Sequence, residues 1–276
     1  MNLDIAAAEA FVFDVDGTLV LSDDPNAAGG GIQVLPGAVE VLRRLRARST
    51  PLVCFTNGSS QPPRLVAAKL RQAGLDIADN ELLTPPVVAA EYIRRRHPAQ
   101  LALAFGNEGV LEPLRHADIP VARLDQAAQA SVVLVGGDQD FTYDKLEAAC
   151  RAVWAGAQLL VTSMAPFFVS RRGRMPSPSG AIAAGIRHAN GVEPLVVGKP
   201  SELVMEMVAA MLGTSTPRMV VVGDDLDLEI RMARNSGAFS VLVLSGSASE
   251  ADLAHVSAKH RPHLVVPVVG DLLAHL

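Results

Sequence analysis

The sequence predicts an α/β protein with a Rossmann-like parallel sheet and a smaller inserted α/β domain. Short apolar runs rich in Val, Leu and Phe alternate with amphipathic helical patterns along the 276 residues, an order typical of parallel sheets. Four of these runs end on a polar residue, at Asp14, Thr56, Lys199 and Asp224. The carboxyl ends of parallel strands form the crevice in which ligands bind. The pattern therefore predicts the place of a site as well as a fold.

The predicted elements follow one another in a regular order. Nine strands are expected at 10–14, 51–57, 101–107, 131–137, 158–163, 193–199, 218–225, 239–246 and 263–268. Helices are expected at 37–48, 63–74, 143–156, 179–190 and 201–212, where apolar residues recur at helical spacing. Gly74, Gly156 and Gly213 are expected to end three of them, because glycine readily adopts the left-handed conformation of a helix C-cap.

The order of the strands divides the chain into domains. We expect the first two strands and the last four to build one sheet, from residues 1–84 and 188–276. Residues 85–187 carry three strand signals of their own and form the inserted domain. Pro and Gly interrupt the chain at both joins, in "TPP" at 84–86 and "HANGVEP" at 188–194.

Composition excludes several classes of function. Hydrophobic residues make up 49% and charged residues 19% of the chain, which is ordinary for a globular protein. A net charge of −5 supplies no basic field for nucleic acid or an anionic membrane. The N-terminus lacks the pattern of a signal peptide, and no apolar run approaches the ~20 residues of a membrane span. We expect a soluble cytoplasmic protein that binds neither nucleic acid nor membranes.

The segment "FVFDVDGT" at 11–18 places two carboxylates at the mouth of a buried strand. A plain turn at Asp16-Gly17 is the alternative reading. However, Asp14 and Asp16 would repel each other unless a cation or a shared proton offset their charge. Carboxylate oxygens at such a place suit Mg²⁺.

Two further strand ends carry groups that suit an anion. "TNGSS" at 56–60 is either a polar turn with a helix cap or a site where the Thr56 hydroxyl and nearby N–H groups hold an anionic oxygen. "VVGKPS" at 196–201 is not a P-loop, because Glu193 stands where that motif needs glycine and Pro200 follows the lysine. Lysine is scarce in this chain, so Lys199 between Gly and Pro is a candidate functional cation.

The segment "VGDDLDLEI" at 222–230 has four acids within six positions. A solvated acidic loop is one reading. The other is that Asp224, directly after an apolar strand, supplies a carboxylate to the same cation as Asp14. The residues alone leave open whether Asp225, Asp227 or Glu229 has a role.

The motif order "DVDGT … TNGSS … VGKPS … GDDLDLEI" resembles the haloacid dehalogenase-like (HAD) superfamily of phosphohydrolases. "VLPGAVEVLRRLR", "VLVGGDQDFTYDKL" and "PLVVGKPSELVMEMV" are similar to its class IIA branch, the NagD-like and p-nitrophenyl phosphatases. The resemblance implies a HAD core and a cap domain formed by the insertion, which excludes water and contacts the leaving group. It also implies a small phosphate ester as substrate, and the branch allows homodimers.

By this resemblance Asp14 is the nucleophile that forms an aspartyl-phosphate, and Asp16 is the general acid and base. Thr56 and Lys199 bind the phosphoryl oxygens, with Asn57 and Gly58 beside them. Mg²⁺ is held by the side chains of Asp14 and Asp224 and by the backbone carbonyl of Asp16.

Two departures from the family pattern affect these expectations. The family has an aspartate where this chain has Glu229, so either Glu229 or Asp225 is expected to complete the metal shell. "TSMAP" at 162–166 replaces a Thr-Asn-x-Asp loop, which leaves the substrate undefined among nucleotides, sugar phosphates, phosphoglycolate and pyridoxal phosphate. A non-catalytic phospholigand-binding relative and a phosphotransferase of the same fold remain the alternatives.

Overall fold

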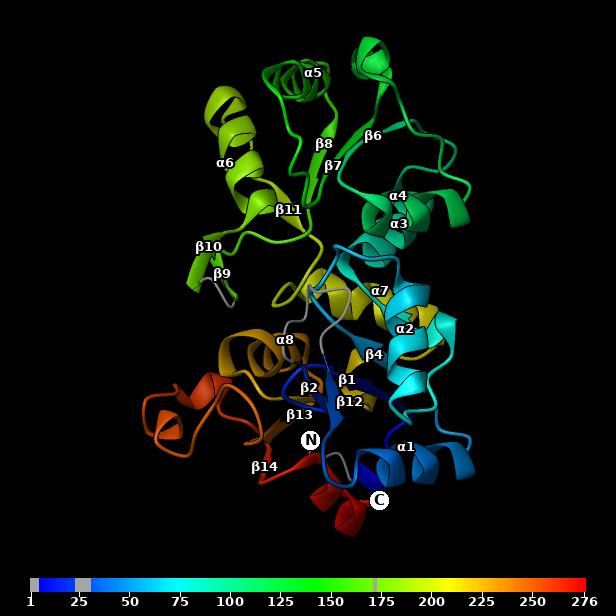
Figure 1. Cartoon of the computed structure of the whole chain (residues 1–276), viewed down its shortest axis with the longest axis vertical. Helices are drawn as coiled ribbons and strands as arrows, with labels where there is room; N and C mark the ends of the chain where they lie inside the picture. Colours follow the sequence, from blue (N-terminus) through cyan, green and yellow to red (C-terminus); the bar gives the residue numbers. More distant parts are fainter. Residues whose placement is uncertain (1–4, 23–30, 171–172) are drawn as a thin grey trace. The chain divides into compact units, whose positions relative to one another are not determined.

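A computed structural model of the chain describes residues 5–22, 31–170 and 173–276. The chain divides into two compact units, each with its own parallel sheet (Figure 1). The first unit contains residues 1–56, 64–83 and 199–276, and the second contains residues 57–63 and 84–198. The predicted α/β class with a core sheet and a separate inserted region is confirmed.

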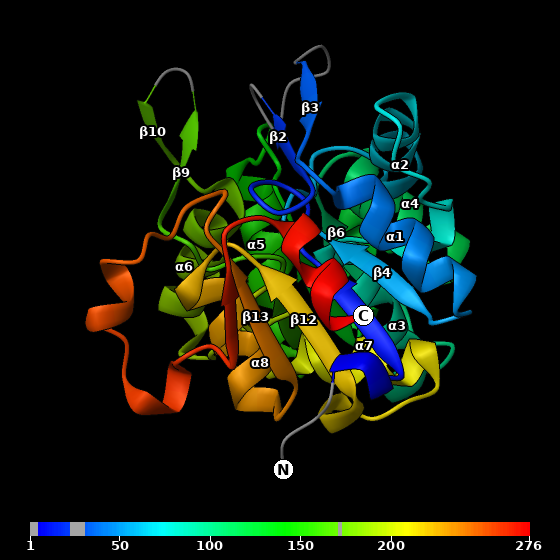
Figure 2. The same ribbon diagram turned by 90° about the horizontal axis from the view of Figure 1, so that it is seen from below.

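The first unit is built on a six-stranded parallel sheet. Its strands are, in spatial order, β14 (Leu264–Val266), β13 (Phe239–Val243), β12 (Met219–Gly223), β1 (Ala10–Phe13), β4 (Leu52–Phe55) and β5 (Leu82–Leu83). Phe13 of β1 pairs with Val222 on one side and with Cys54 on the other. Figure 2 shows β12 and β13 side by side. The strand that carries Asp14 at its end therefore lies inside the sheet, with a neighbour on each side.

Helices cover both faces of this sheet, which explains the unbroken apolar runs of its strands. All residues of β1, β4 and β12 are buried. On one face Phe11 and Phe13 belong to the same buried hydrophobic cluster as Val41, Leu42 and Leu45 of α1. The helices are α1 (Ala38–Ala47), α2 (Pro63–Gln72), α7 (Glu202–Leu212) and α8 (Arg231–Ser236). Short helical turns are η1 (Ile5–Ala7), η2 (Asp79–Glu81), η4 (Thr216–Arg218), η5 (Leu226–Ile230), η6 (Asp252–Ala254), η7 (Ala258–His260) and η8 (Val269–His275).

A small antiparallel pair, β2 (Val20–Ser22) with β3 (Ile32–Val34), projects from the unit (Figure 2).

The second unit has a four-stranded parallel sheet. Its spatial order is β11 (Leu195–Val196), β8 (Gln158–Val161), β7 (Val132–Val135) and β6 (Ala102–Phe105). The helices are α3 (Pro85–Arg96), α4 (Glu108–His116), α5 (Tyr143–Trp154) and α6 (Pro178–Asn190), with the turn η3 (Leu124–Gln129). An antiparallel pair, β9 (Phe167–Ser170) and β10 (Gly173–Pro176), precedes α6. Alanines of α5 pack against Val133 and Val135 to form the core of this unit.

One strand assignment from the sequence is wrong, and one strand of the core sheet was not predicted. The run at 193–199 does not join the core sheet, because Leu195 and Val196 pair with Leu160 and Val161 of β8 in the second unit. The core sheet instead gains β5, a two-residue strand that is too short to give a strand pattern of its own. The domain limits 1–84, 85–187 and 188–276 stay a proposal. They differ from the compact units at residues 57–63, 84 and 188–198.

The helix predictions agree with the structure within two residues at each end, and Gly74, Gly156 and Gly213 have positive φ angles as expected. Within the described ranges, no helix is long and apolar enough to cross a membrane.

Candidate active site

Three polar residues follow neighbouring strands of the core sheet. Asp14 follows β1, Thr56 follows β4 and Asp224 follows β12. The register places them at the same edge, since β1 pairs with both β4 and β12 and the Asp14 N–H donates to the Val222 carbonyl (2.9 Å). The predicted convergence of Asp14 and Asp224 is thus observed, although the paired residues Ala10 and Met219 are 209 positions apart in the sequence.

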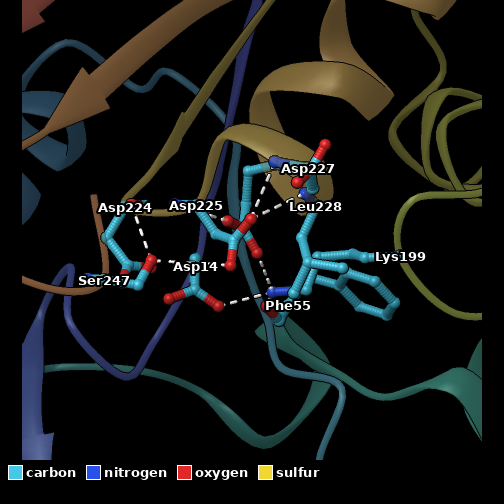
Figure 3. A network of polar contacts seen from close by, with 9 residues as sticks. Asp14, Phe55, Lys199, Asp224, Asp225, Asp227, Leu228 and Ser247 are labelled. Carbon is cyan, nitrogen blue, oxygen red and sulfur yellow. Dashed lines mark hydrogen bonds and ion pairs between the residues drawn. The ribbon is translucent and has the colours of Figure 1, made fainter. Parts of the chain in front are cut away.

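Lys199 lies among the carboxylates at this edge. Its Nζ is 2.5 Å from Asp14 Oδ1 and 2.6 Å from Glu229 Oε1, and it donates to the Phe55 carbonyl at 3.1 Å (Figure 3). The lysine is only 4% exposed. Burial alone would lower the pKa of Lys199, but the Asp14 and Glu229 carboxylates raise the pKa above its ordinary value. The ammonium is therefore charged, and it is fixed by three acceptors.

The second oxygen of Asp14 has a different environment. Asp14 Oδ2 is buried and has no hydrogen-bond partner in the described part of the chain. In Figure 3 one oxygen of Asp14 faces Lys199 and the other points away from it. A buried carboxylate oxygen without a partner is costly in an apolar protein interior. Such an oxygen suits a cation or the phosphorus of a substrate.

Asp224 is held rigidly at the same edge. The Ser247 N–H donates to Asp224 Oδ2 (2.7 Å), and the Ser247 hydroxyl donates to the Asp224 carbonyl (2.9 Å). Burial raises the pKa of Asp224, and the charge of Asp14 raises it further, while the bonds from Ser247 oppose the shift. A cation between the two aspartates would remove this repulsion.

Two glycines give the Asp224 carboxylate its space. A Cβ at Gly17 would lie 2.4 Å from Asp224 Oδ2, and one at Gly246 would lie 2.1 Å from the same atom. Gly17 also has a φ of 83°, a conformation that other residues rarely adopt. The glycine that follows Asp16 is therefore required both for the turn and for the close approach of Asp224.

Asp16 is half-buried beside Asp14. The Ser22 hydroxyl donates a hydrogen bond to Asp16 Oδ1. Burial raises the pKa of Asp16, and the Asp14 charge adds to the effect, whereas Ser22 and Lys199 oppose it. A raised pKa favours the protonated carboxyl, which is the form that a general acid needs.

Glu229 and Asp225, the two candidates for a further metal ligand, both have protein partners. Besides its ion pair with Lys199, Glu229 accepts a bond from the Asp225 N–H at Oε2 (3.2 Å). Asp225 Oδ1 accepts from the N–H groups of Asp227 (2.8 Å) and Leu228 (3.0 Å) and so caps η5. As metal ligands they stay predictions.

Gly223 makes room for the longer side chain of Glu229. A Cβ on Gly223 would lie 2.3 Å from Glu229 Cγ. Burial raises the pKa of Glu229 to about 8; Lys199 opposes that shift, and the charges of Asp14 and Asp224 add to it.

Among the described residues, no group of three or more His, Cys, Asp and Glu side chains is arranged to hold a metal ion. The predicted magnesium site needs only two side chains, Asp14 and Asp224, with a backbone carbonyl. The unpartnered Asp14 oxygen and the repulsion between the two aspartates fit a cation at that place.

The remaining predicted residues are divided between the units. Thr56 belongs to the first unit, and its N–H donates to the Leu83 carbonyl (3.2 Å). Asn57 and Gly58 belong to the second unit. The roles of all three in phosphate binding stay predictions.

Sequence reasoning missed the residues that support the site. Ser247 and Gly246 follow β13, the strand next to β12, and contact Asp224. Ligands bind at the carboxyl ends of parallel strands, and β13 is one of these strands. The segment "SGS" at 245–247 has no charged residue, however, so the sequence did not identify it as a candidate.

Two family models match the chain. Residues 11–120 match the haloacid dehalogenase-like hydrolases, and residues 196–272 match a HAD-hydrolase-like model. Together they span more than half of the chain and include Asp14, Lys199 and Asp224. The chain belongs to the haloacid dehalogenase-like hydrolases.

Relatives place this HAD hydrolase in the class IIA, NagD-like branch. It is 27% identical to NagD from E. coli K-12 (TM-score 0.81, covering 96% of this chain and 98% of that one). It is 28% identical to the 4-nitrophenylphosphatase from Thermotoga maritima (TM-score 0.83, covering 99% of each chain). By sequence it is 26% identical to the 5'-nucleotidase YutF of Bacillus subtilis, over 86% of this chain and 88% of the relative. It is 27% identical to an acid sugar phosphatase of Staphylococcus epidermidis, over 89% and 90%.

Proposed function

We propose that this protein is a Mg²⁺-dependent phosphomonoesterase that hydrolyses a small phosphorylated metabolite through an aspartyl-phosphate. Hydrolysis of phosphate monoesters is the activity for which the relatives are named. One observation carries the proposal for this chain. Asp14 has one oxygen paired with a buried lysine and the other oxygen buried without a partner, so the free oxygen suits attack on phosphorus.

Asp14 and Asp16 divide the chemistry between them. Asp14 forms a bond to phosphorus while the bond from phosphorus to the ester oxygen breaks, and Asp16 donates its proton to that leaving oxygen. Asp16, now ionised, takes a proton from water. The water oxygen then attacks the aspartyl-phosphate, which releases inorganic phosphate and restores the Asp14 carboxylate.

Lys199 lowers the electrostatic barrier to this attack. A phosphate ester and Asp14 are both anionic, so their approach needs a positive charge close to both. The Lys199 ammonium is already 2.5 Å from Asp14 and is held by Glu229 and the Phe55 carbonyl. Thr56, Asn57 and Gly58 are proposed to bind the other phosphoryl oxygens.

The side chains of Asp14 and Asp224 and the carbonyl of Asp16 would hold Mg²⁺. When bound, the ion supplies positive charge that offsets the repulsion between carboxylate and phosphate. Asp225 and Glu229 are the two further candidates to complete its shell.

The substrate class remains a proposal among nucleotides, sugar phosphates, phosphoglycolate and pyridoxal phosphate. The relatives are named as a nucleotidase, a sugar phosphatase and a nitrophenylphosphatase, so they do not single out one ester. We propose that residues 85–187 act as the cap and that the "TSMAP" loop helps to select the substrate. This loop is fastened to α6: the Ser179 hydroxyl donates to the Ser163 carbonyl (3.1 Å), and the Ser177 N–H donates to the Pro166 carbonyl (3.2 Å). A cytoplasmic location also stays a prediction.

Phosphate release from a panel of these esters, with Mg²⁺ and with EDTA, tests the function. We expect release that EDTA abolishes and that excess Mg²⁺ restores, because the two aspartates need a cation to bind a dianionic ester. Binding without release would favour the non-catalytic alternative. Phosphate transfer to an added alcohol in preference to water would favour the phosphotransferase.

A second prediction concerns the space around Asp224. The substitution Gly246→Ala places a Cβ 2.1 Å from Asp224 Oδ2 and must displace the carboxylate. We expect the dissociation constant for Mg²⁺, measured by calorimetry, to rise about tenfold or more. Gly137→Ala is the matched control, because a Cβ there meets nothing within 4 Å. Unchanged Mg²⁺ affinity in Gly246→Ala would mean that Asp224 does not hold the ion.

A further inference from the structure

The segment 59–61 lies against the first turn of α4, and both belong to the second unit. A Cβ added to Gly109, the second residue of α4, would lie 2.3 Å from the Ser59 carbonyl oxygen and 2.9 Å from the Gln61 nitrogen. Non-bonded atoms do not approach so closely. Both neighbours are backbone atoms, so no rotation of a side chain would relieve the contact. The backbone of 59–61 therefore packs directly on Gly109.

This contact explains why residue 109 is glycine. The φ angle of Gly109 is not positive, so no left-handed conformation requires glycine there. The residue is buried within a helix, where glycine is less favourable than alanine. Gly109 therefore weakens α4 locally, and what it allows is the close approach of 59–61.

A second glycine packs against the start of the same stretch. A Cβ on Gly198 would lie 3.0 Å from Asn57 Oδ1 and 2.2 Å from the Thr162 carbonyl oxygen. These three residues also belong to the second unit. The stretch 57–61 is thus packed by Gly198 at its first residue and by Gly109 at its end.

We propose that Gly109 is a positioning residue for phosphate binding, because it lets the 59–61 backbone rest on α4 and so fixes Asn57 and Gly58. The inference rests on the proposed function, in which Asn57 and Gly58 bind phosphoryl oxygens. Gly109 itself does not contact the phosphate in this role. A binding group that is misplaced by about 1 Å can cost on the order of a hundredfold in rate. A methyl group at residue 109 must displace the segment that holds both binding residues.

The substitution Gly109→Ala tests this role. We expect the dissociation constant for inorganic phosphate, measured by calorimetry with saturating Mg²⁺, to rise about tenfold or more. The dissociation constant for Mg²⁺ without phosphate should stay within about twofold, because the proposed ligands Asp14 and Asp224 lie in the first unit. Gly185→Ala is the matched control, since it replaces another helical glycine of the second unit and its Cβ meets only Leu146 Cδ1, at 3.9 Å. It should leave both constants unchanged.

The outcomes separate this inference from the proposed function. Unchanged phosphate affinity in Gly109→Ala, with a wild type that binds phosphate, would overturn the positioning role and leave the proposed function intact. An equal loss of phosphate and Mg²⁺ affinity would indicate a general disturbance of the fold and would also overturn that role. A wild type that binds no phosphate would overturn the proposed function, and this inference with it.

A milder pair of variants decides the question if Gly109→Ala does not fold. Asn107 caps α4, because its Oδ1 accepts a hydrogen bond from the Gly109 N–H (3.1 Å), and its side chain is exposed. We expect Asn107→Ala to loosen the first turn of α4 and to raise the phosphate dissociation constant about threefold or more. Asn107→Ser keeps a capping oxygen and should restore the constant to within about twofold of the wild type. Equal phosphate affinity in Asn107→Ala and the wild type would then overturn the proposal.

Discussion

Asp14→Asn is expected to lower the rate of phosphate release on the order of 10⁴-fold or more, with ligand binding retained. The amide has nearly the shape of the carboxylate but cannot form the aspartyl-phosphate. The loss of charge also removes repulsion toward a phosphate ester. We therefore expect inorganic phosphate and substrate to bind at least as tightly as in the wild type, as measured by calorimetry.

The matched control is Asp76→Asn, because the Asp76 side chain is 85% exposed and lies in the same unit. It should leave turnover unchanged. A protein that binds phosphate esters equally well with either residue, and releases no phosphate with either, is a binding protein. Retained turnover in Asp14→Asn would remove Asp14 from the role of nucleophile.

Lys199→Met is expected to destabilise the first unit by about 3–5 kcal/mol, in addition to its effect on turnover. The methionine fills similar space but leaves Asp14 and Glu229 as two buried carboxylates without their shared cation. Urea unfolding in the presence of EDTA, followed by far-ultraviolet circular dichroism, measures the change. Lys259→Met, at an exposed lysine of the same unit, should change the stability by less than about 0.5 kcal/mol.

The double variant Lys199→Met/Glu229→Gln separates charge from packing. Removal of the Glu229 charge takes away one of the two unpaired carboxylates, so part of the lost stability should return. The fluorescence of Trp154 reports on the second unit, and its transition should move less than the circular dichroism transition. A double variant less stable than Lys199→Met would show that Glu229 supports the fold by its other contacts, such as the bond from the Asp225 N–H.

Much of this site was predictable because parallel strands bring their carboxyl ends together. The apolar runs that end at Asp14 and Asp224 are long enough to predict two strands of one sheet, and the structure pairs these strands side by side. The structure places Lys199, the predicted functional cation, in buried ion pairs with Asp14 and Glu229, and its role in binding phosphate stays a prediction. The sheet to which 193–199 belongs was not predictable, because its short apolar run at 195–197 carries no information about which strands lie beside it.

The roles of Asp225, Glu229 and Ser247 depend on contacts that a sequence does not show. Glu229 is one methylene longer than the aspartate of the family pattern, and the space that it fills exists because residue 223 is glycine. Asp225 is one of two alternatives for a further metal ligand, and in the structure one oxygen of its carboxylate caps η5. Which partner each of these side chains takes depends on the exact positions of the neighbouring groups in the folded chain, and the sequence does not give those positions.

The pairing of β1 with β12 also sets the order of events during synthesis. Ala10 pairs with Met219, so the ribosome must add 209 further residues before the strand that bears Asp14 can be flanked on that side. At ordinary rates of translation this takes roughly 10–40 s. During that interval the apolar residues of β1 have only part of their final cover. The candidate site of Asp14, Lys199 and Asp224 can therefore assemble only after the last of these residues has been synthesised.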